Sequence, residues 1–191
     1  MEQLKGKSSA LMIVVVVVAA GIFYFINGGP GSSGTNGSTN RPSGAIEMNV
    51  GRVSYDGTFS GQVVSTGRNA RKGLQEFGTD QKVRLRLLDI EPPPRFGEKC
   101  WRDESQKAIE DLVGSRIWVA PNNVREQGSG TFTVYAWNRS KIFVQEQLLR
   151  DGNGKIIGDG VSYPRYEDAL VAAEDEADKA DRGLWKACGV S

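Results

Sequence analysis

The sequence contains no histidine, only two cysteines and almost no excess of either charge. The lack of histidine removes the commonest general base and the commonest ligand of transition metals. Any catalysis would therefore use carboxylates, arginine, lysine, tyrosine, serine or a hard metal ion. A formal net charge of +1 over 191 residues excludes a strongly basic nucleic-acid binder by composition, although it leaves room for a local basic patch. Cys100 and Cys188 lack the CxxC spacing of a zinc or thioredoxin-type site.

One long apolar run lies near the N-terminus, from Ala10 to Ile26. A membrane-spanning helix needs about 17–25 apolar residues, so this run is long enough for a short anchor. A cleaved signal peptide is the alternative, because Ala19-Ala20-Gly21 offers small residues for a cleavage site. The bulky residues Phe23-Tyr24-Phe25 that follow at once favour an uncleaved transmembrane anchor at 10–26.

The lysines predict the orientation of this anchor. Lys5 and Lys7 precede the apolar run, and no Lys or Arg follows it before Arg41. The positive-inside rule then leaves residues 1–9 in the cytoplasm and places the rest on the periplasmic or extracellular side. Residues 27–44 are rich in Gly, Ser and Asn, which is typical of a flexible linker. The expected partners are thus the membrane itself and other envelope proteins.

Residues 45–191 are predicted to form one domain of the α+β class, because strands and helices are segregated along the chain. In the clearest strand, Val83, Leu85 and Leu87 alternate with arginines. Asp103 and Ser140 are predicted as helix N-caps. The expected strands are Thr58 to Thr66, Arg68 to Phe77, Lys82 to Leu88, Arg116 to Ala120 and Thr131 to Trp137, and the expected helices are Asp103 to Val113, Ile142 to Arg150 and Tyr166 to Asp181. This order fits a small five-stranded barrel with helices packed on it.

The run from Val83 to Asp89 resembles the third strand of the staphylococcal nuclease (thermonuclease) family, in which an Arg lies five residues before a metal-binding Asp. Other segments follow in the order of that family: Phe96-Gly97-Glu98 with the helix to Val113, Val134-Tyr135-Ala136, Phe143 to Leu149, and Ala173 to Ala180 closing on Arg182-Gly183-Leu184-Trp185. The resemblance extends from Phe59 to Ala187 and implies an OB-type five-stranded β-barrel with three helices.

The resemblance implies Ca²⁺-dependent hydrolysis of phosphodiester bonds in DNA and RNA. That chemistry needs carboxylates to hold calcium, a carboxylate to orient water and arginines to bind the phosphate. By position, Arg84 matches the arginine that binds the phosphate and Asp89 matches a calcium ligand. Ile90 stands where a backbone carbonyl would coordinate the metal, and Glu91 is the acid nearest to the position of the water-orienting carboxylate.

Three motifs of the family are altered. Its Asp-x-Pro-Glu reads Asp89-Ile90-Glu91-Pro92 here, so the glutamate comes one residue early and, on an extended backbone, faces the other way. Its Gly-Arg-Gly reads Gly128-Ser129-Gly130, which lacks the second arginine. Its Asp-Gly-Asp-Thr turn is expected near Ser65-Thr66-Gly67-Arg68, which holds no acid.

These departures predict a catalytically impaired domain that acts as a binding or assembly module. The alternative is a surface-tethered, Ca²⁺-dependent nuclease whose rearranged site uses Arg84, Asp89 and Glu91. Calcium dependence of cleavage separates the two interpretations.

A basic cluster of Arg68, Arg71 and Lys72 is a candidate contact for nucleic acid or lipid headgroups. An ordinary solvated strand face is the simpler interpretation of the same three residues. Among the tryptophans, Trp185 is predicted in the core by its place in the family, and Trp137 is the candidate for an exposed ring.

Cys100 opens the first helical region, and Cys188 follows the last one. In the implied fold both helix ends can lie on the same side of the domain. A disulfide is favoured over two free thiols, because the domain is predicted to lie outside the cytoplasm.

Overall fold

The structure is a computed structural model that describes residues 39–54, 56–65, 82–92, 100–125, 130–158 and 160–189. The chain divides into two compact units, Met1–Thr35 and Asn36–Ser191, and every described residue belongs to the second. The predicted anchor at 10–26 therefore lies outside the described residues. Among the helices within those ranges, none is long and apolar enough to span a bilayer.

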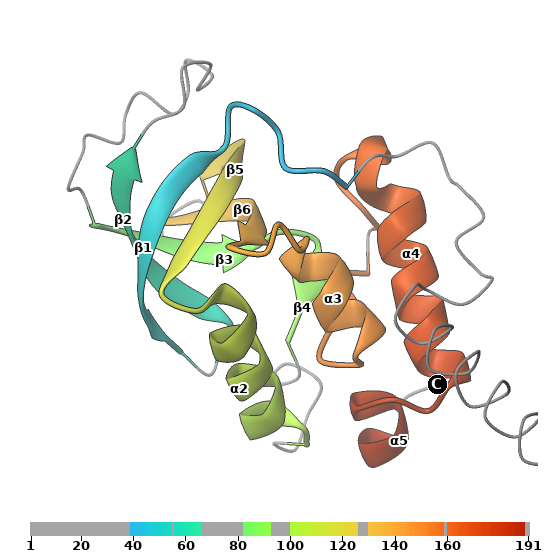
Figure 1. Cartoon of the computed structure of the whole chain (residues 1–191). Helices are drawn as coiled ribbons and strands as arrows, with labels where there is room; N and C mark the ends of the chain where they lie inside the picture. Colours follow the sequence, from blue (N-terminus) through green and yellow to red (C-terminus); the bar gives the residue numbers. More distant parts are fainter. Residues whose placement is uncertain are drawn as a thin grey trace, which may run out of the picture. The chain divides into compact units, whose positions relative to one another are not determined.

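Five strands close into a barrel in the spatial order β1-β2-β3-β6-β5 (Figure 1). Their bounds are β1 Ile46–Val53, β2 Thr58–Ser65, β3 Lys82–Leu87, β5 Arg116–Arg125 and β6 Thr131–Asn138. Neighbouring strands are antiparallel except β3 and β6, which run parallel. A separate two-stranded sheet pairs β4 Ile90–Glu91 with β7 Lys155–Ile156. The predicted five-stranded barrel of the α+β class is confirmed.

The strand β1 was not expected from the sequence. Ile46, Met48 and Val53 are buried, but the alternation between them breaks at Gly51, where the pairing with β2 shifts register. A Cβ on Gly51 would lie 2.2 Å from the Ser60 hydroxyl oxygen, so the strands approach closely there. The predicted strand at 68–77 lies outside the described residues. With β1 in place, the first hairpin turn falls at residues 54–57 and not near residue 65.

The strand β3 alternates as predicted. Its apolar side chains point into the barrel, where Val83, Leu85 and Leu87 are all buried, and Arg84 lies on the outer face. Burying a side chain of this size contributes about 1.5–3 kcal/mol. Packing of these side chains in the barrel core therefore fixes the position of Arg84 on the outer face of β3.

Helices pack against one end and one side of the barrel. Their bounds are α2 Arg102–Val113, α3 Val144–Arg150, α4 Pro164–Lys179 and a short α5 Leu184–Cys188. The three expected helices are present: α2 and α3 end at the predicted residues but start elsewhere, and both ends of α4 differ by two residues. In α4, Tyr166, Leu170, Ala173 and Ala177 recur at helical spacing, and all four are buried.

Both predicted N-caps are wrong. The helix α2 begins after Trp101 without a side-chain cap, and the Asp103 carboxylate instead accepts a hydrogen bond from Arg102 Nε at 3.1 Å. The helix α3 begins after Phe143, because the Asn138 side-chain oxygen accepts the amides of Ser140 and Ile142 at 3.0 Å each and holds them in a turn.

The predicted disulfide between Cys100 and Cys188 is present, with the two Cα atoms 5.9 Å apart. Beside it, Asn153 accepts hydrogen bonds from Trp101 Nε1 at 2.9 Å and from the Ser105 hydroxyl at 2.6 Å. Trp185 of α5 is buried, as predicted. The C-terminal helix is thus joined to the start of α2.

The prediction of an exposed ring at Trp137 is wrong. The strand β6 lies between β3 and β5, and the Trp137 ring is covered by the rest of the fold. Trp137 has no exposed surface, stacks on Phe143 with ring centroids 5.1 Å apart and donates from Nε1 to the Thr39 carbonyl at 2.6 Å. Close by in the chain, the Arg41 guanidinium lies 4.5 Å from the centroid of Trp118. The described end of the predicted linker therefore packs on the barrel.

The unit Asn36–Ser191 contains the whole described core and the disulfide. A fragment with these bounds keeps every described contact, so we treat it as an independent folding unit.

We expect the double substitution Cys100→Ser and Cys188→Ser to lower the free energy of unfolding of this fragment by about 2–5 kcal/mol, because the crosslink closes a long loop of the unfolded chain. Urea denaturation measures the difference, and chemical reduction of the unmodified fragment serves as the matched control. An unchanged midpoint in both samples would show that the bond contributes nothing to stability.

Candidate functional site

The hairpin turn between β1 and β2 places an acid at the barrel surface. Gly57 has a φ of 73°, and a Cβ there would lie 2.6 Å from Pro92, so the turn requires glycine. The Asp56 carboxylate accepts the Thr58 amide at 3.0 Å and the Thr58 hydroxyl at 2.6 Å. These bonds hold the carboxylate beside β3.

Arg84 of β3 reaches this turn. Its Nε and Nη2 donate to the Thr58 hydroxyl oxygen at 3.3 and 3.1 Å, and Nη2 also lies 3.4 Å from Asp56 Oδ2. The side chains of Arg84 and Asp56 are 56% and 37% exposed. Such an exposed ion pair contributes little stability, so its main effect is to orient the guanidinium.

The same contacts set the charge of the turn. Partial burial by itself would raise the pKa of Asp56, but the two hydrogen bonds from Thr58 and the positive charge of Arg84 hold that pKa below its usual value. The carboxylate is therefore ionised at neutral pH and offsets part of the charge of Arg84.

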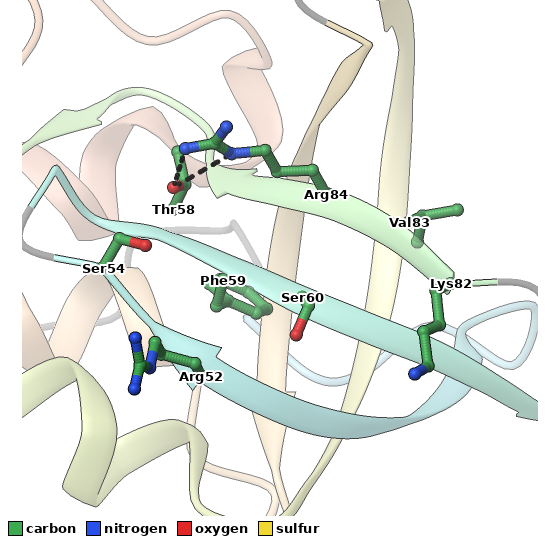
Figure 2. A pocket seen from close by; sticks show the side chains of 8 residues that line it. All are labelled: Arg52, Ser54, Thr58, Phe59, Ser60, Lys82, Val83 and Arg84. Carbon is green, nitrogen blue, oxygen red and sulfur yellow. Dashed lines mark hydrogen bonds between the residues drawn. The ribbon is translucent and has the colours of Figure 1, made fainter.

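An open groove of about 380 Å³ runs over the outer face of β1, β2 and β3 beside this cluster (Figure 2). It is lined by Arg52, Ser54, Thr58, Phe59, Ser60, Lys82, Val83 and Arg84. Three of these side chains are cationic and three carry hydroxyl groups, which is the composition of a site for an anion.

Asp89 lies elsewhere, in the short connection between β3 and β4. Its φ is 64°, an uncommon conformation that Asp adopts more readily than most residues. The side chain is buried, and its two carboxylate oxygens accept hydrogen bonds from the Tyr135 and Ser162 hydroxyls. The Asp89 carbonyl also accepts the Ile157 amide at 3.0 Å. Hydrogen bonds within the fold thus hold both the side chain and the backbone carbonyl of Asp89.

The partner Tyr135 belongs to an aromatic cluster between β6 and α4. Its ring lies 4.6 Å from Tyr166 and 5.8 Å from Tyr163, measured between centroids. Burial, together with the hydrogen bond and the negative charge of Asp89, raises the pKa of the Tyr135 phenol. The phenol therefore stays protonated at neutral pH and keeps donating to Asp89.

The structure places the two remaining candidates, Ile90 and Glu91, in the small sheet. Ile90 is buried and pairs with Ile156, and Glu91 pairs with Lys155 in the small sheet. Within the described ranges, no hydrogen bond or ion pair joins the side chains of Arg84, Asp89 and Glu91 to one another.

Other candidates lie outside the described residues, namely Arg68, Arg71, Lys72 and the Gly128-Ser129 part of the altered arginine motif. In the part of the chain that the structure describes, no three acidic or cysteine side chains gather closely enough to hold a metal ion.

Sequence reasoning missed Asp56, because it placed the first hairpin one strand too late. The turn near Ser65 that appeared to lack an acid is not the first turn of the barrel. The dipeptide Asp56-Gly57 is itself a strong hairpin signal and would have identified the turn if the preceding strand had been recognised.

A closed five-stranded barrel with helices packed on it is the architecture of an OB-like domain of the α+β class. The family model described as "Staphylococcal nuclease homologue" matches residues 83–187. The chain therefore belongs to the staphylococcal nuclease homologue family. No curated protein matches the chain.

Asp89 provides a direct stability test of this geometry. We expect Asp89→Ala to lower the free energy of unfolding by about 1–3 kcal/mol, because it leaves the buried Tyr135 hydroxyl without its acceptor. Asp89→Asn should cost less, since asparagine keeps an acceptor oxygen and tolerates a positive φ. Thermal and urea unfolding measure both variants.

The control for this series is Asp168→Ala, which removes an exposed acid of α4 and should leave stability within about 0.5 kcal/mol of the unmodified protein. Equal stability of Asp89→Ala and the unmodified protein would contradict the buried role of this carboxylate.

Proposed function

We propose that this chain is a membrane-anchored member of its family that acts as a binding or assembly module and lacks the calcium-dependent nuclease activity of the family. In this proposal residues 10–26 form the anchor, and the barrel lies on the periplasmic or extracellular side. The observation that carries the proposal is the orientation of Asp89, which points into the fold and not toward Arg84.

Calcium binds through six to eight oxygen ligands at about 2.3–2.6 Å, and carboxylates supply most of its charge compensation. The carboxylate of Asp89 is 2% exposed, and both of its oxygens already accept hydrogen bonds. Turning it outward would leave the Tyr135 hydroxyl buried without an acceptor, at a cost of about 1–3 kcal/mol. The described donors therefore do not fit a calcium ion at this position.

The second acid near the site does not replace Asp89. The Asp56 carboxylate accepts hydrogen bonds from Thr58 and pairs with Arg84, so it orients the arginine. Glu91 lies in the separate two-stranded sheet with Lys155. Among the described residues, Arg84 thus remains as a cation for binding an anion, and no hydrogen bond or ion pair joins its side chain to Asp89 or Glu91.

One observation favours the alternative, a tethered Ca²⁺-dependent nuclease with a rearranged site. The Arg84 side chain remains more than half exposed and is held in one orientation by Thr58 and Asp56, as phosphate binding in the transition state would require. An assay of cleavage distinguishes the two functions.

The test is cleavage of labelled single-stranded DNA and RNA by the full-length protein, with calcium and with a chelator. We expect no calcium-dependent cleavage above the buffer control, because a catalytic unit loses most of its rate when one of its essential groups is absent. Circular dichroism and a cooperative melting transition verify that the protein is folded.

Calcium-dependent cleavage that disappears in both Arg84→Ala and Asp89→Asn would contradict the proposal and establish the alternative. Cleavage that survives in both variants would indicate a contaminating nuclease. The variant Arg139→Gln, which removes an exposed arginine away from the groove, is the matched control for general loss of charge.

A further inference from the structure

We propose that the groove on the outer face of β1, β2 and β3 binds the phosphate headgroups of anionic phospholipids. Arg52, Ser60 and Lys82 line this groove and come from three neighbouring strands. The inference rests on the proposed function in one respect, which is that the domain is a binding module tethered at a membrane.

The pairing of the strands brings these residues to one face. Ser60 lies opposite Arg84, and Gln62 lies opposite Lys82, so the outward residues of β2 and β3 form adjacent rows. Arg52 precedes the inward-facing Val53, which pairs with the inward-facing Phe59. Figure 2 shows the side chains of Arg52, Ser60 and Lys82 on the same side of the sheet.

The side chains of Arg52 and Lys82 are exposed and make no hydrogen bond or ion pair with any other described residue. Elsewhere the described cations are commonly paired with acids, as are Arg102, Lys107, Arg116, Arg150, Lys179 and Arg182. At the edge of the groove, the Asp56 carboxylate offsets part of the positive charge of Arg84. The groove therefore presents two cations whose charge no described carboxylate neutralises.

These groups fit a phosphate. The guanidinium fork of Arg52 matches two phosphate oxygens, and the Lys82 ammonium acts as a mobile point charge. The hydroxyls of Ser54 and Ser60 have no hydrogen-bond partner among the described residues and supply neutral donors in the same groove. The open shape of the groove suits a headgroup at a surface more than an enclosed small molecule.

A lipid headgroup fits the lining better than single-stranded nucleic acid does. Proteins that bind single strands stack the bases on exposed aromatic rings. Among the described residues that line this groove, the one aromatic is Phe59, which is 1% exposed and faces the core. The described lining therefore offers charge and hydroxyls for a phosphate but no exposed ring for a base.

The charge of the rest of the domain favours a flat anionic partner. The helix α4 carries six acidic and two basic residues and packs against α3, away from β1 and β2 (Figure 1). A planar anionic surface would attract the groove and repel α4, so it would orient the domain with its barrel toward the lipid.

With the predicted tether holding the domain at the membrane, a weak interaction between the groove and the lipid headgroups is sufficient for binding. Twelve residues, 27–38, separate the predicted anchor from the first described residue. A Gly- and Ser-rich chain of this length has an end-to-end distance of about 20 Å. A tether this short would keep the groove near the bilayer at a high effective concentration.

The experiment measures co-sedimentation of the fragment Asn36–Ser191 with vesicles of pure phosphatidylcholine or of phosphatidylcholine mixed with phosphatidylglycerol. We expect binding to the mixed vesicles only. The double variant Arg52→Gln with Lys82→Gln should bind about 30-fold more weakly, since each basic residue at an anionic surface contributes about a fivefold gain.

The matched control is the double variant Arg139→Gln with Lys186→Gln, which removes the same charge from exposed positions outside the groove. It should bind as the unmodified fragment does. Equal weakening by the two double variants would overturn the groove as the site, and so would equal binding to both kinds of vesicle. Thermal unfolding verifies that each variant is folded.

A single-stranded oligonucleotide, added as a competitor, tests the other class of partner. The assignment to lipid would be overturned if the fragment bound the oligonucleotide more tightly than the vesicles and lost that binding in the double variant Arg52→Gln with Lys82→Gln. Cleavage of that oligonucleotide with calcium would refute the proposed function and leave the groove result intact. Failure to bind vesicles, without cleavage, would refute this inference alone.

Discussion

The buried carboxylate of Asp89 joins three parts of the structure that are far apart in the chain. Through the Tyr135 hydroxyl it is bonded to the barrel strand β6, and through Ser162 it is bonded to the segment before α4. Its own backbone carries β3 into the small sheet of β4 and β7. A buried polar group is tolerated only when it is fully hydrogen-bonded, so these contacts must form together.

This arrangement separates Arg84 of β3 from Asp89, which follows the end of the same strand. Arg84 ends on the outer face of the barrel beside Thr58 and Asp56, whereas Asp89 ends inside the fold. A residue pair that the family motif would place around one substrate is thus divided between a surface and a core. The surface keeps the capacity to bind an anion, and the core gains a satisfied hydrogen-bond network.

Much of the fold was predictable because its signals are local. The alternation of Val83, Leu85 and Leu87 identified β3, and the helical spacing of Leu170, Ala173 and Ala177 identified α4. The strand β1 was missed because its alternation is interrupted at the register shift near Gly51, and such a shift depends on the partner strand. The helix starts were wrong for a related reason, since Asn138 offers the backbone a competing turn that residue preferences alone do not reveal.

By itself the sequence determined the family, four of the five barrel strands, the three main helices, and the prediction that Cys100 and Cys188 pair. These conclusions depend on composition, periodicity and motif order, which are visible in the sequence without knowledge of which segments are in contact. Only the tertiary structure decided that Asp56 stands beside Arg84, that Trp137 is buried and donates to the Thr39 carbonyl, and that Arg52 and Lys82 share one groove. Each of these depends on contacts between distant segments, and the register of the strands sets which side chains meet.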